Sequence, residues 1–135
     1  MAIEIQGRQP AAAGGKFLRL EFWVWRPIQA LVAQLCPDLL DERTLDGMAF
    51  GRGTGAADQK ICTEIARRLE LWQASHPEGL DLDLGIKTTT DGRFLTEQEL
   101  SENPSQKTVS TYQASPHDLQ KWIAFLKCCG GFEVW

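Results

Sequence analysis

Hydrophobic and polar residues alternate over Phe17–Trp25, the segment FLRLEFWVW, with the period of two that is typical of a β-strand. One face of this predicted strand is entirely apolar and comprises Leu18, Leu20, Phe22 and Val24. The other face is first charged and then aromatic, in the order Arg19, Glu21, Trp23 and Trp25. We therefore predict a strand that runs from solvent into a covered region.

The pattern changes to a helical period after Arg26-Pro27. Proline suits the first turn of a helix because that position has no intrahelical hydrogen bond to lose. The apolar stripe that follows, at spacing i, i+3, i+4 and i+7, comprises Ile28, Leu31, Val32 and Leu35. These features predict a helix from Pro27 to about Cys36, followed by an irregular segment over Asp38–Gly55.

Two further helices are predicted from stripes of the same kind. The longer one spans Ala56–Ser75, and its buried face comprises Ile61, Ile65, Leu69 and Trp72, widened by Cys62 and Ala66. The last helix has the strongest start signals, because Ser115 can cap it, Pro116 can open it and Asp118 complements the helix dipole. Its stripe is Leu119, Trp122, Ile123 and Leu126, and Gly130-Gly131 end it.

Short alternating segments predict the remainder of a small sheet. We expect an edge strand at Ile3–Gly7 and further strands at Leu80–Ile86, Thr108–Tyr112 and Phe132–Trp135. Residues 1–15 are interpreted as an extended N-terminal arm, and residues 88–106 as a long polar loop. Together the elements predict a single α+β domain over residues 1–135, with about three helices packed on a small, mostly antiparallel sheet.

The composition is that of a globular chain and excludes several classes of function. Hydrophobic residues make up 43% of the 135 residues, but no run is long enough to span a membrane, and the N-terminus lacks the features of a signal peptide. The formal net charge is −4 and the basic residues are scattered, so we expect neither nucleic acid nor a membrane as partner. The expected location is the cytoplasm, where the four cysteines should stay reduced.

The cysteines and histidines do not form a recognisable catalytic or metal-binding motif. Cys128 and Cys129 are adjacent, no C-x₂₋₄-C pair is present, and Cys36 and Cys62 extend the apolar stripes of their helices. His117 would lie about 16 Å from Cys128 on the same predicted helix, too far away to act as its base. We therefore expect no catalytic residue, no metal site and no cofactor.

The segment FGRGTGAADQK, residues 50–60, places three glycines ahead of the longest predicted helix. Its G-x-G-x-G spacing matches neither the dinucleotide nor the P-loop fingerprint. In one interpretation, helix N-terminal amides and the Arg52 guanidinium bind an anion, and the candidate ligand-binding residues are Gly51, Arg52, Gly53, Thr54 and Gly55. In the other, the loop is only a flexible entrance to the helix, which Thr54 or Gly55 caps.

Trp23 and Trp25, beside Arg26, form the second candidate ligand-binding group. Two tryptophans on one strand face can stack on a planar or sugar ligand, or form a hot spot for a protein partner. The alternative is that a helix covers both indoles as part of the core, with Trp72 and Trp122 as packing neighbours.

The segments EFWVWRPI and FLKCCGGFEVW resemble parts of small bacterial proteins that share a Trp-Arg-Pro segment and a Gly-Gly-Phe C-terminal close. The resemblance implies a compact, self-contained domain and no named activity. Two function classes remain open. We favour a non-catalytic domain that binds a protein or a small ligand. The alternative is a small enzyme or ligand-binding protein that acts on an anionic, phosphorylated substrate at the Gly51–Gly55 loop.

Overall fold

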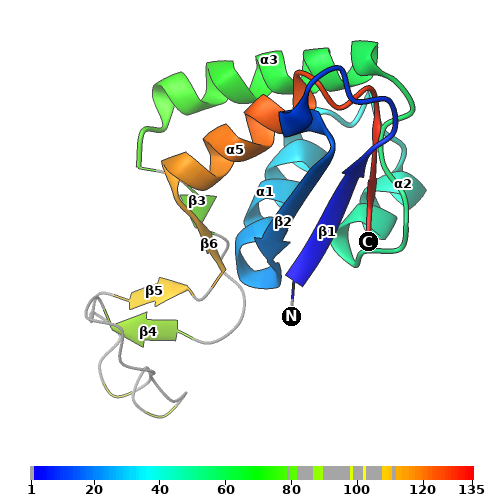
Figure 1. The fold of residues 1–135 in the computed structure, drawn as a ribbon. Helices are drawn as coiled ribbons and strands as arrows, with labels where there is room; N and C mark the ends of the chain where they lie inside the picture. The colour runs from blue at the N-terminus through cyan, green and yellow to red at the C-terminus, as the bar shows by residue number, and fades with distance from the viewer. Residues whose placement is uncertain are drawn as a thin grey trace.

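The main sheet of the domain has three antiparallel strands. In this computed structural model residues 2–78, 80–81, 87–89, 98, 102, 108–110 and 112–135 are described. The strands are β1 (Ala2–Gly7), β2 (Phe17–Glu21) and β7 (Phe132–Val134), in the order β2-β1-β7. The described helices are α1 (Phe22–Leu35), α2 (Glu42–Ala49), α3 (Gln59–Ser75) and α5 (Pro116–Leu126) (Figure 1). The predicted α+β class is confirmed, and the described residues contain one helix more than expected.

Shorter elements complete the described part of the chain. A 3₁₀ turn, η1 (Ala13–Gly15), precedes β2. Two further antiparallel pairs consist of β3 (Leu80–Asp81) with β6 (Gln113–Ala114), and β4 (Lys87–Thr89) with β5 (Thr108–Ser110). Strands thus form at the start of two predicted segments, whereas residues 82–86 and most of the predicted polar loop 88–106 lie outside the described residues.

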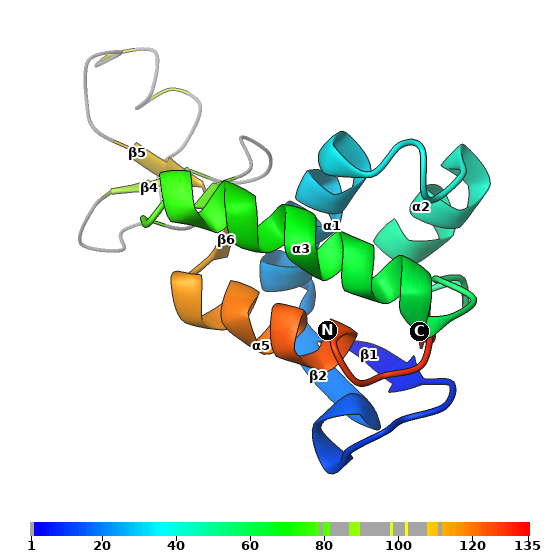
Figure 2. The same cartoon turned by 90° about the horizontal axis from the view of Figure 1, so that it is seen from above.

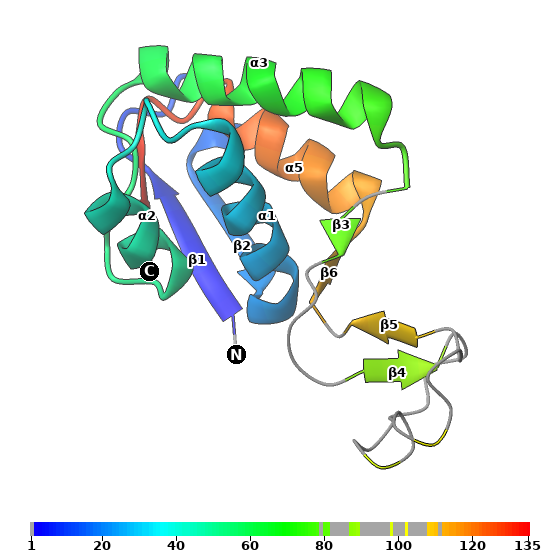
Figure 3. The same ribbon diagram turned by 180° about the vertical axis from the view of Figure 1, so that it is seen from behind.

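The three-stranded sheet has one buried face and one solvent face. Along β1, Ile3 and Ile5 are buried whereas Glu4 and Gln6 are exposed, which is the alternation of a half-buried strand. Helix α1 lies behind the sheet in Figure 1 and in front of it in Figure 3, so it covers the buried face. Seen from above, α3 and α5 run side by side (Figure 2). The prediction that Ile3–Gly7 is an edge strand is wrong, because β1 pairs with β2 on one side and β7 on the other.

The predicted strand over Phe17–Trp25 is too long, because the backbone turns into α1 at Phe22. Tertiary contacts override the local alternation here. The Trp25 indole is fully buried and donates a hydrogen bond of 2.8 Å to the carbonyl oxygen of Met48. Pro27 therefore lies inside the helix rather than at its first residue. Because proline has no N–H, the carbonyl of Trp23 receives no helical hydrogen bond from it.

The segment predicted as irregular, Asp38–Gly55, contains helix α2. The Asp41 carboxylate caps this helix by accepting a hydrogen bond of 2.7 Å from the backbone N–H of Thr44. The buried Gln29 side chain of α1 donates to the carbonyl oxygen of Leu45 at 3.0 Å. Together with the Trp25 bond, this contact fixes α2 against α1.

The core is centred on Trp122, which is fully buried on α5. Its indole meets Trp25 edge to face with ring centroids 5.1 Å apart, meets Phe132 in the same way at 5.2 Å, and stacks near Phe125. The predicted stripe of α5 is buried throughout, and Ser115 and Asp118 form a complete capping box. Trp72 differs from the expectation, since it is only partly buried and stacks on His76 at 4.1 Å.

We expect Trp122→Ala to lower the free energy of unfolding by about 3–5 kcal/mol, because it leaves a large cavity between three aromatic rings. Trp72→Ala is the matched comparison and should cost clearly less, since its indole is partly exposed. Urea denaturation of both variants measures the difference. Equal costs would contradict this description of the core.

A cluster of charged side chains joins α3 to the end of α1. The Arg68 guanidinium contacts Asp38 at 2.6 and 2.9 Å and Glu64 at 3.0 Å, and it donates to the carbonyl oxygen of Leu35 at 2.8 Å. The Glu64 carboxylate also pairs with Arg67 at 2.6 Å, so it contacts both arginines. The hydrogen bond from Arg68 lowers the pKa of Asp38 to about 2, and those from Arg67 and Arg68 lower the pKa of Glu64 to about 2.

These lowered pKa values predict an acid-dependent loss of stability. A carboxylate with a lower pKa in the folded state stabilises the fold above its unfolded pKa, 3.8 for aspartate and 4.5 for glutamate, and loses that contribution as the pH falls towards about 2. We expect the melting temperature of Arg68→Met to fall less steeply than that of the wild type between pH 4.5 and 2. Arg67→Met is the control. It leaves the Asp38–Arg68 pair intact, so its melting temperature should keep the part of the pH dependence that comes from Asp38. Parallel curves for wild type and Arg68→Met would contradict the prediction.

Candidate functional site

An exposed phenylalanine with two arginines against it marks the end of α2. Phe50 is the residue after Ala49, the last residue of α2, and its side chain is 56% exposed. The guanidinium carbon of Arg26 lies 5.1 Å from the centre of this ring, and that of Arg52 lies 5.5 Å from it. Both distances are within the range of cation–π attraction. Phe50 therefore brings Arg26 of α1 close to Arg52 of the segment Gly51–Gly55, which we call the glycine loop.

Trp23 extends this group along α1. Trp23 and Arg26 are three residues apart on the helix, so they occupy neighbouring positions on one side of it. The Trp23 side chain is 47% exposed, its ring centroid lies 4.9 Å from that of Tyr112, and Phe22 meets both rings edge to face. Three aromatic rings therefore cluster next to Arg26.

Trp135 continues the group on the other side of the glycine loop. A Cβ atom added at Gly53 would overlap the Trp135 ring, so the indole lies directly on this glycine. Its side chain is 52% exposed and donates to a Glu133 carboxylate oxygen at 3.3 Å. In Figures 1 and 3 the C-terminus lies beside α2. We call the set Trp23, Arg26, Phe50, Arg52 and Trp135 the aromatic–arginine surface.

Trp25 does not belong to this surface, although the sequence paired it with Trp23. The pairing assumed a strand, in which residues two apart share a face. On a helix, residues two apart point about 200° away from each other. Trp25 accordingly packs into the core against Trp122, whereas Trp23 remains at the surface. The interpretation of Trp25 as core is therefore confirmed, and that of a two-tryptophan platform is wrong.

The glycine loop packs against the C-terminal strand. The backbone N–H of Gly53 donates to the carbonyl oxygen of Val134 at 2.7 Å, and the N–H of Val134 donates to that of Thr54 at 2.9 Å. A Cβ at Gly55 would overlap the carbonyl oxygen of Phe132. The three glycines at alternate positions lack a Cβ atom, and this leaves room for strand β7 and Trp135 to approach the loop closely.

The same geometry shows that the predicted cap of α3 is wrong. The cap is Asp58, whose carboxylate accepts from the backbone N–H of Ile61 at 3.0 Å. The hydroxyl of Thr54 instead donates to the carbonyl oxygen of Thr44 at 2.7 Å. Thr54 therefore holds the loop against α2 rather than starting α3.

These contacts favour a structural role for the loop over an anion cradle. The N–H groups of Arg52 and Gly53 are already bonded to backbone oxygens. The adjacent hollow, of about 750 Å³, brings three carboxylates together with two guanidiniums and is lined by Asp41, Glu42, Arg43, Asp46, Gly47, Arg52 and Thr54. An anion there would meet one more negative than positive side chain. Anion binding at Gly51–Gly55 remains an untested alternative.

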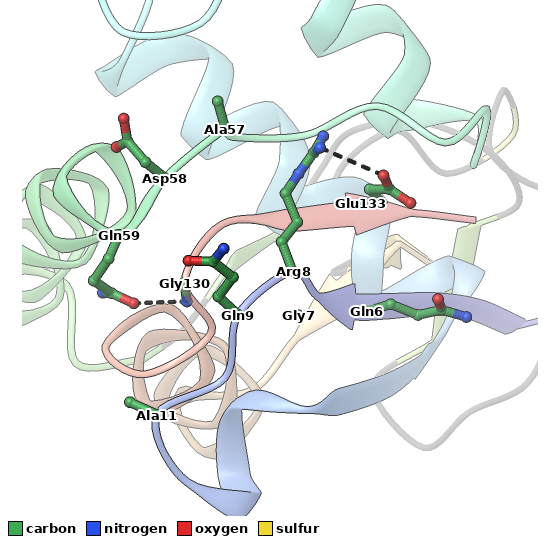
Figure 4. A pocket seen from close by; sticks show the side chains of 10 residues that line it. All are labelled: Gln6, Gly7, Arg8, Gln9, Ala11, Ala57, Asp58, Gln59, Gly130 and Glu133. Atoms are coloured by element: carbon green, nitrogen blue, oxygen red, sulfur yellow. Dashed lines mark hydrogen bonds and ion pairs between the residues drawn. The ribbon is translucent and has the colours of Figure 1, made fainter.

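A second hollow, of about 560 Å³, lies where β1, the start of α3 and the Gly130 turn meet (Figure 4). Arg8 crosses it and pairs with Glu133 at 3.5 Å, while its Nε donates to the carbonyl oxygen of Phe132. The Gln59 side chain accepts from the N–H of Gly130 at 2.8 Å. Arg8 and Gln59 are therefore already hydrogen-bonded to neighbouring protein groups, which leaves fewer polar groups in this hollow to bind a ligand.

Two of the four cysteines touch in the interior. The Sγ atoms of Cys62 and Cys129 are 3.6 Å apart and both residues are fully buried. The hydrogen bond between the thiols, together with burial, raises the pKa of Cys62. The same bond and the backbone N–H of Gly131 lower the pKa of Cys129. In the part of the chain that the structure describes, no three histidine, cysteine or acidic side chains gather as a metal site would require.

Sequence reasoning missed Phe50 and Trp135 of the aromatic–arginine surface, and Tyr112, which packs against Trp23. Phe50 immediately precedes the glycine loop, and Trp135 is the last residue of the sequence. Neither belongs to the apolar stripe of a predicted helix, and a large aromatic residue outside such a stripe is the only sequence signal for this site. Their proximity to Trp23 and Arg26 depends on how α1, α2 and β7 pack.

No family model, curated protein sequence or solved structure gives a significant match to this chain. The resemblance to small bacterial proteins therefore remains a prediction. Among the described helices, none combines the length and the apolar character that crossing a bilayer requires.

Gly55→Ala tests the structural interpretation of the loop. We expect it to lower the free energy of unfolding by about 1–3 kcal/mol, because the added methyl group overlaps the backbone of Phe132. Gly14→Ala is the matched control, since the nearest atom to its added Cβ is the Cys128 sulfur at 4.0 Å. Chemical denaturation compares the two variants, and an unaffected Gly55→Ala would contradict the packing of the loop against β7.

Proposed function

We propose that this protein is a non-catalytic binding domain that docks a protein partner on the aromatic–arginine surface. The observation that supports the proposal is the exposed Phe50 ring with Arg26 and Arg52 both against it. Tryptophan, tyrosine and arginine side chains dominate the binding energy of protein interfaces, because they combine a large apolar area with polar ends. Here the tryptophans and arginines come from α1, the glycine loop and the C-terminus, around Phe50 at the end of α2.

The charge of the surface favours a partner with carboxylates at the contact. The chain as a whole has a formal charge of −4, yet two guanidiniums lie on this surface. Packing against Phe50 restrains the two side chains, so less conformational entropy is lost when they pair with an acidic group. Phe50 and Trp23 supply apolar area. Because Arg52 also borders the hollow that contains three carboxylates, we infer that an acidic group of the partner binds beside the Phe50 ring, where Arg26 and Arg52 converge, and not in that hollow.

A photo-crosslinking experiment tests this function. A benzophenone amino acid replaces Phe50 in cells that naturally make the protein, and the control replaces Leu71, an equally exposed apolar residue (62%) on α3. We expect one discrete protein adduct from position 50 and none from position 71. Identical adducts from both positions, or none from position 50, would contradict the proposal.

The identified partner then permits a quantitative test. Arg52→Glu should weaken binding of the purified partner at least tenfold, equivalent to about 1.4 kcal/mol, because it replaces attraction to a carboxylate by repulsion. Arg67→Glu on α3 is the control and should leave the affinity unchanged. Circular dichroism and melting temperature should confirm that both variants fold. Equal affinity of Arg52→Glu and wild type would contradict the inference that Arg52 attracts an acidic group of the partner.

A further inference from the structure

The contact between Cys62 and Cys129 plays no part in the proposed binding function. The two residues are 67 positions apart in the sequence, and they come from the first turns of α3 and from the turn between α5 and β7. Their sulfur atoms are 3.6 Å apart, which is van der Waals contact. A disulfide bond needs a separation of about 2 Å, so the sulfurs would have to approach by only about 1.5 Å.

We propose that Cys62 and Cys129 form an oxidation site, a buried dithiol that a hydroperoxide converts reversibly to a disulfide linking α3 to the α5–β7 turn. The geometry alone selects this pair among the four cysteines. Cys36 is buried beside the Arg68 guanidinium rather than beside a second thiol. Cys128 is partly exposed, and its sulfur contacts the carbonyl oxygen of Ala124 at 3.5 Å.

The surroundings of the two sulfurs give them different roles. The hydrogen bond between the two thiols lowers the pKa of Cys129, as does the backbone N–H of Gly131, whereas the same bond and burial raise the pKa of Cys62. Cys129 also lies next to Gly130, which lines the hollow of Figure 4, whereas Cys62 lies within helix α3. We therefore assign Cys129 as the nucleophile and Cys62 as the resolving thiol.

The reaction consumes one hydroperoxide for each disulfide. The Cys129 thiolate attacks the terminal peroxide oxygen, the O–O bond breaks, and the alkoxide or hydroxide released takes up a proton to leave as alcohol or water. The Cys62 sulfur then attacks the sulfenic acid at Cys129, forming the S–S bond. The sulfenic oxygen leaves as water with the proton from Cys62. The two thiols lose two electrons and the peroxide gains them.

The polar hollow of Figure 4 lies beside the turn that carries Cys129. Its lining includes Gly130, the residue after Cys129, and Gln59, three residues before Cys62. The N-terminal segment covers the same turn, because the N–H of Gln9 donates to the carbonyl oxygen of Cys129 at 3.1 Å. Local opening of this segment would expose Cys129 without unfolding the helices.

The test treats the reduced full-length protein with equimolar hydrogen peroxide and maps the products by mass spectrometry under non-reducing conditions. We expect the intact mass to fall by two hydrogen atoms, with the peptides of Cys62 and Cys129 joined, and dithiothreitol to reverse the change. The oxidised protein should melt at a higher temperature, because the cross-link closes a long loop of the unfolded chain.

Variants separate this pair from other thiol chemistry. In Cys62→Ala the resolving thiol is missing, so Cys129 should accumulate as a sulfenic acid that dimedone traps. Cys36→Ala is the matched buried control, and it should form the disulfide as the wild type does, as should Cys128→Ala. A Cys128–Cys129 disulfide, or oxidation of Cys36 before Cys129, would overturn the proposal. If Cys62→Ala does not fold, the wild-type peptide map decides alone.

Discussion

The position of strand β7 is the constraint on which most of this structure depends. Its three residues are bonded on one side to β1, with Val134 opposite Ile5, and on the other side to the glycine loop, with Val134 opposite Thr54. A strand this short makes few hydrogen bonds to either neighbour. The strand is held in the sheet because both of its edges are hydrogen-bonded and because the side chains of Phe132 and Val134 are fully buried. This one placement fixes the glycine loop, the thiol contact and Trp135.

The parts of the fold that could be predicted from the sequence are those fixed by neighbouring residues. Helix α5 has its cap, its first-turn proline and its acidic third residue within four positions, and the structure reproduces all three. Helix α2 has a comparable local signal in Asp41, which caps it through the N–H of Thr44 and is followed by Glu42 in the first turn. Helix α3 also has a local signal, because Asp58 caps it through the N–H of Ile61, but two other residues with cap-like character lie just ahead of it. Its apparent caps, Thr54 and Gly55, are held in place by α2 and by a strand almost 80 residues away.

The start of α1 shows how assigning a strand in place of a helix changes a functional interpretation. The segment alternates like a strand as far as Trp25, and its β-branched and aromatic residues suit that assignment. In the structure the helix already begins at Phe22, and Trp25 is buried between α2 and Trp122. The helical geometry then separates Trp23 from Trp25 and places Trp23 on the side of Arg26. The candidate residues Trp23, Arg26 and Arg52 do converge, but around Phe50, a residue that no local pattern distinguished.

Strand β7 also separates the two sites that we propose. Cys129 precedes the Gly130-Gly131 turn that leads into the strand, and Trp135 follows Val134, the last residue of the strand. The aromatic–arginine surface is exposed and charged, whereas the thiol pair is enclosed between α3 and the Gly130-Gly131 turn. A disulfide at the thiol pair would add a covalent link beside the hydrogen bonds that hold this turn. The cation–π contacts of Phe50 lie beyond the other end of β7 and involve α1, the end of α2 and Arg52 of the glycine loop. Partner binding and thiol oxidation are therefore structurally distinct properties, and either can fail experimentally without affecting the other.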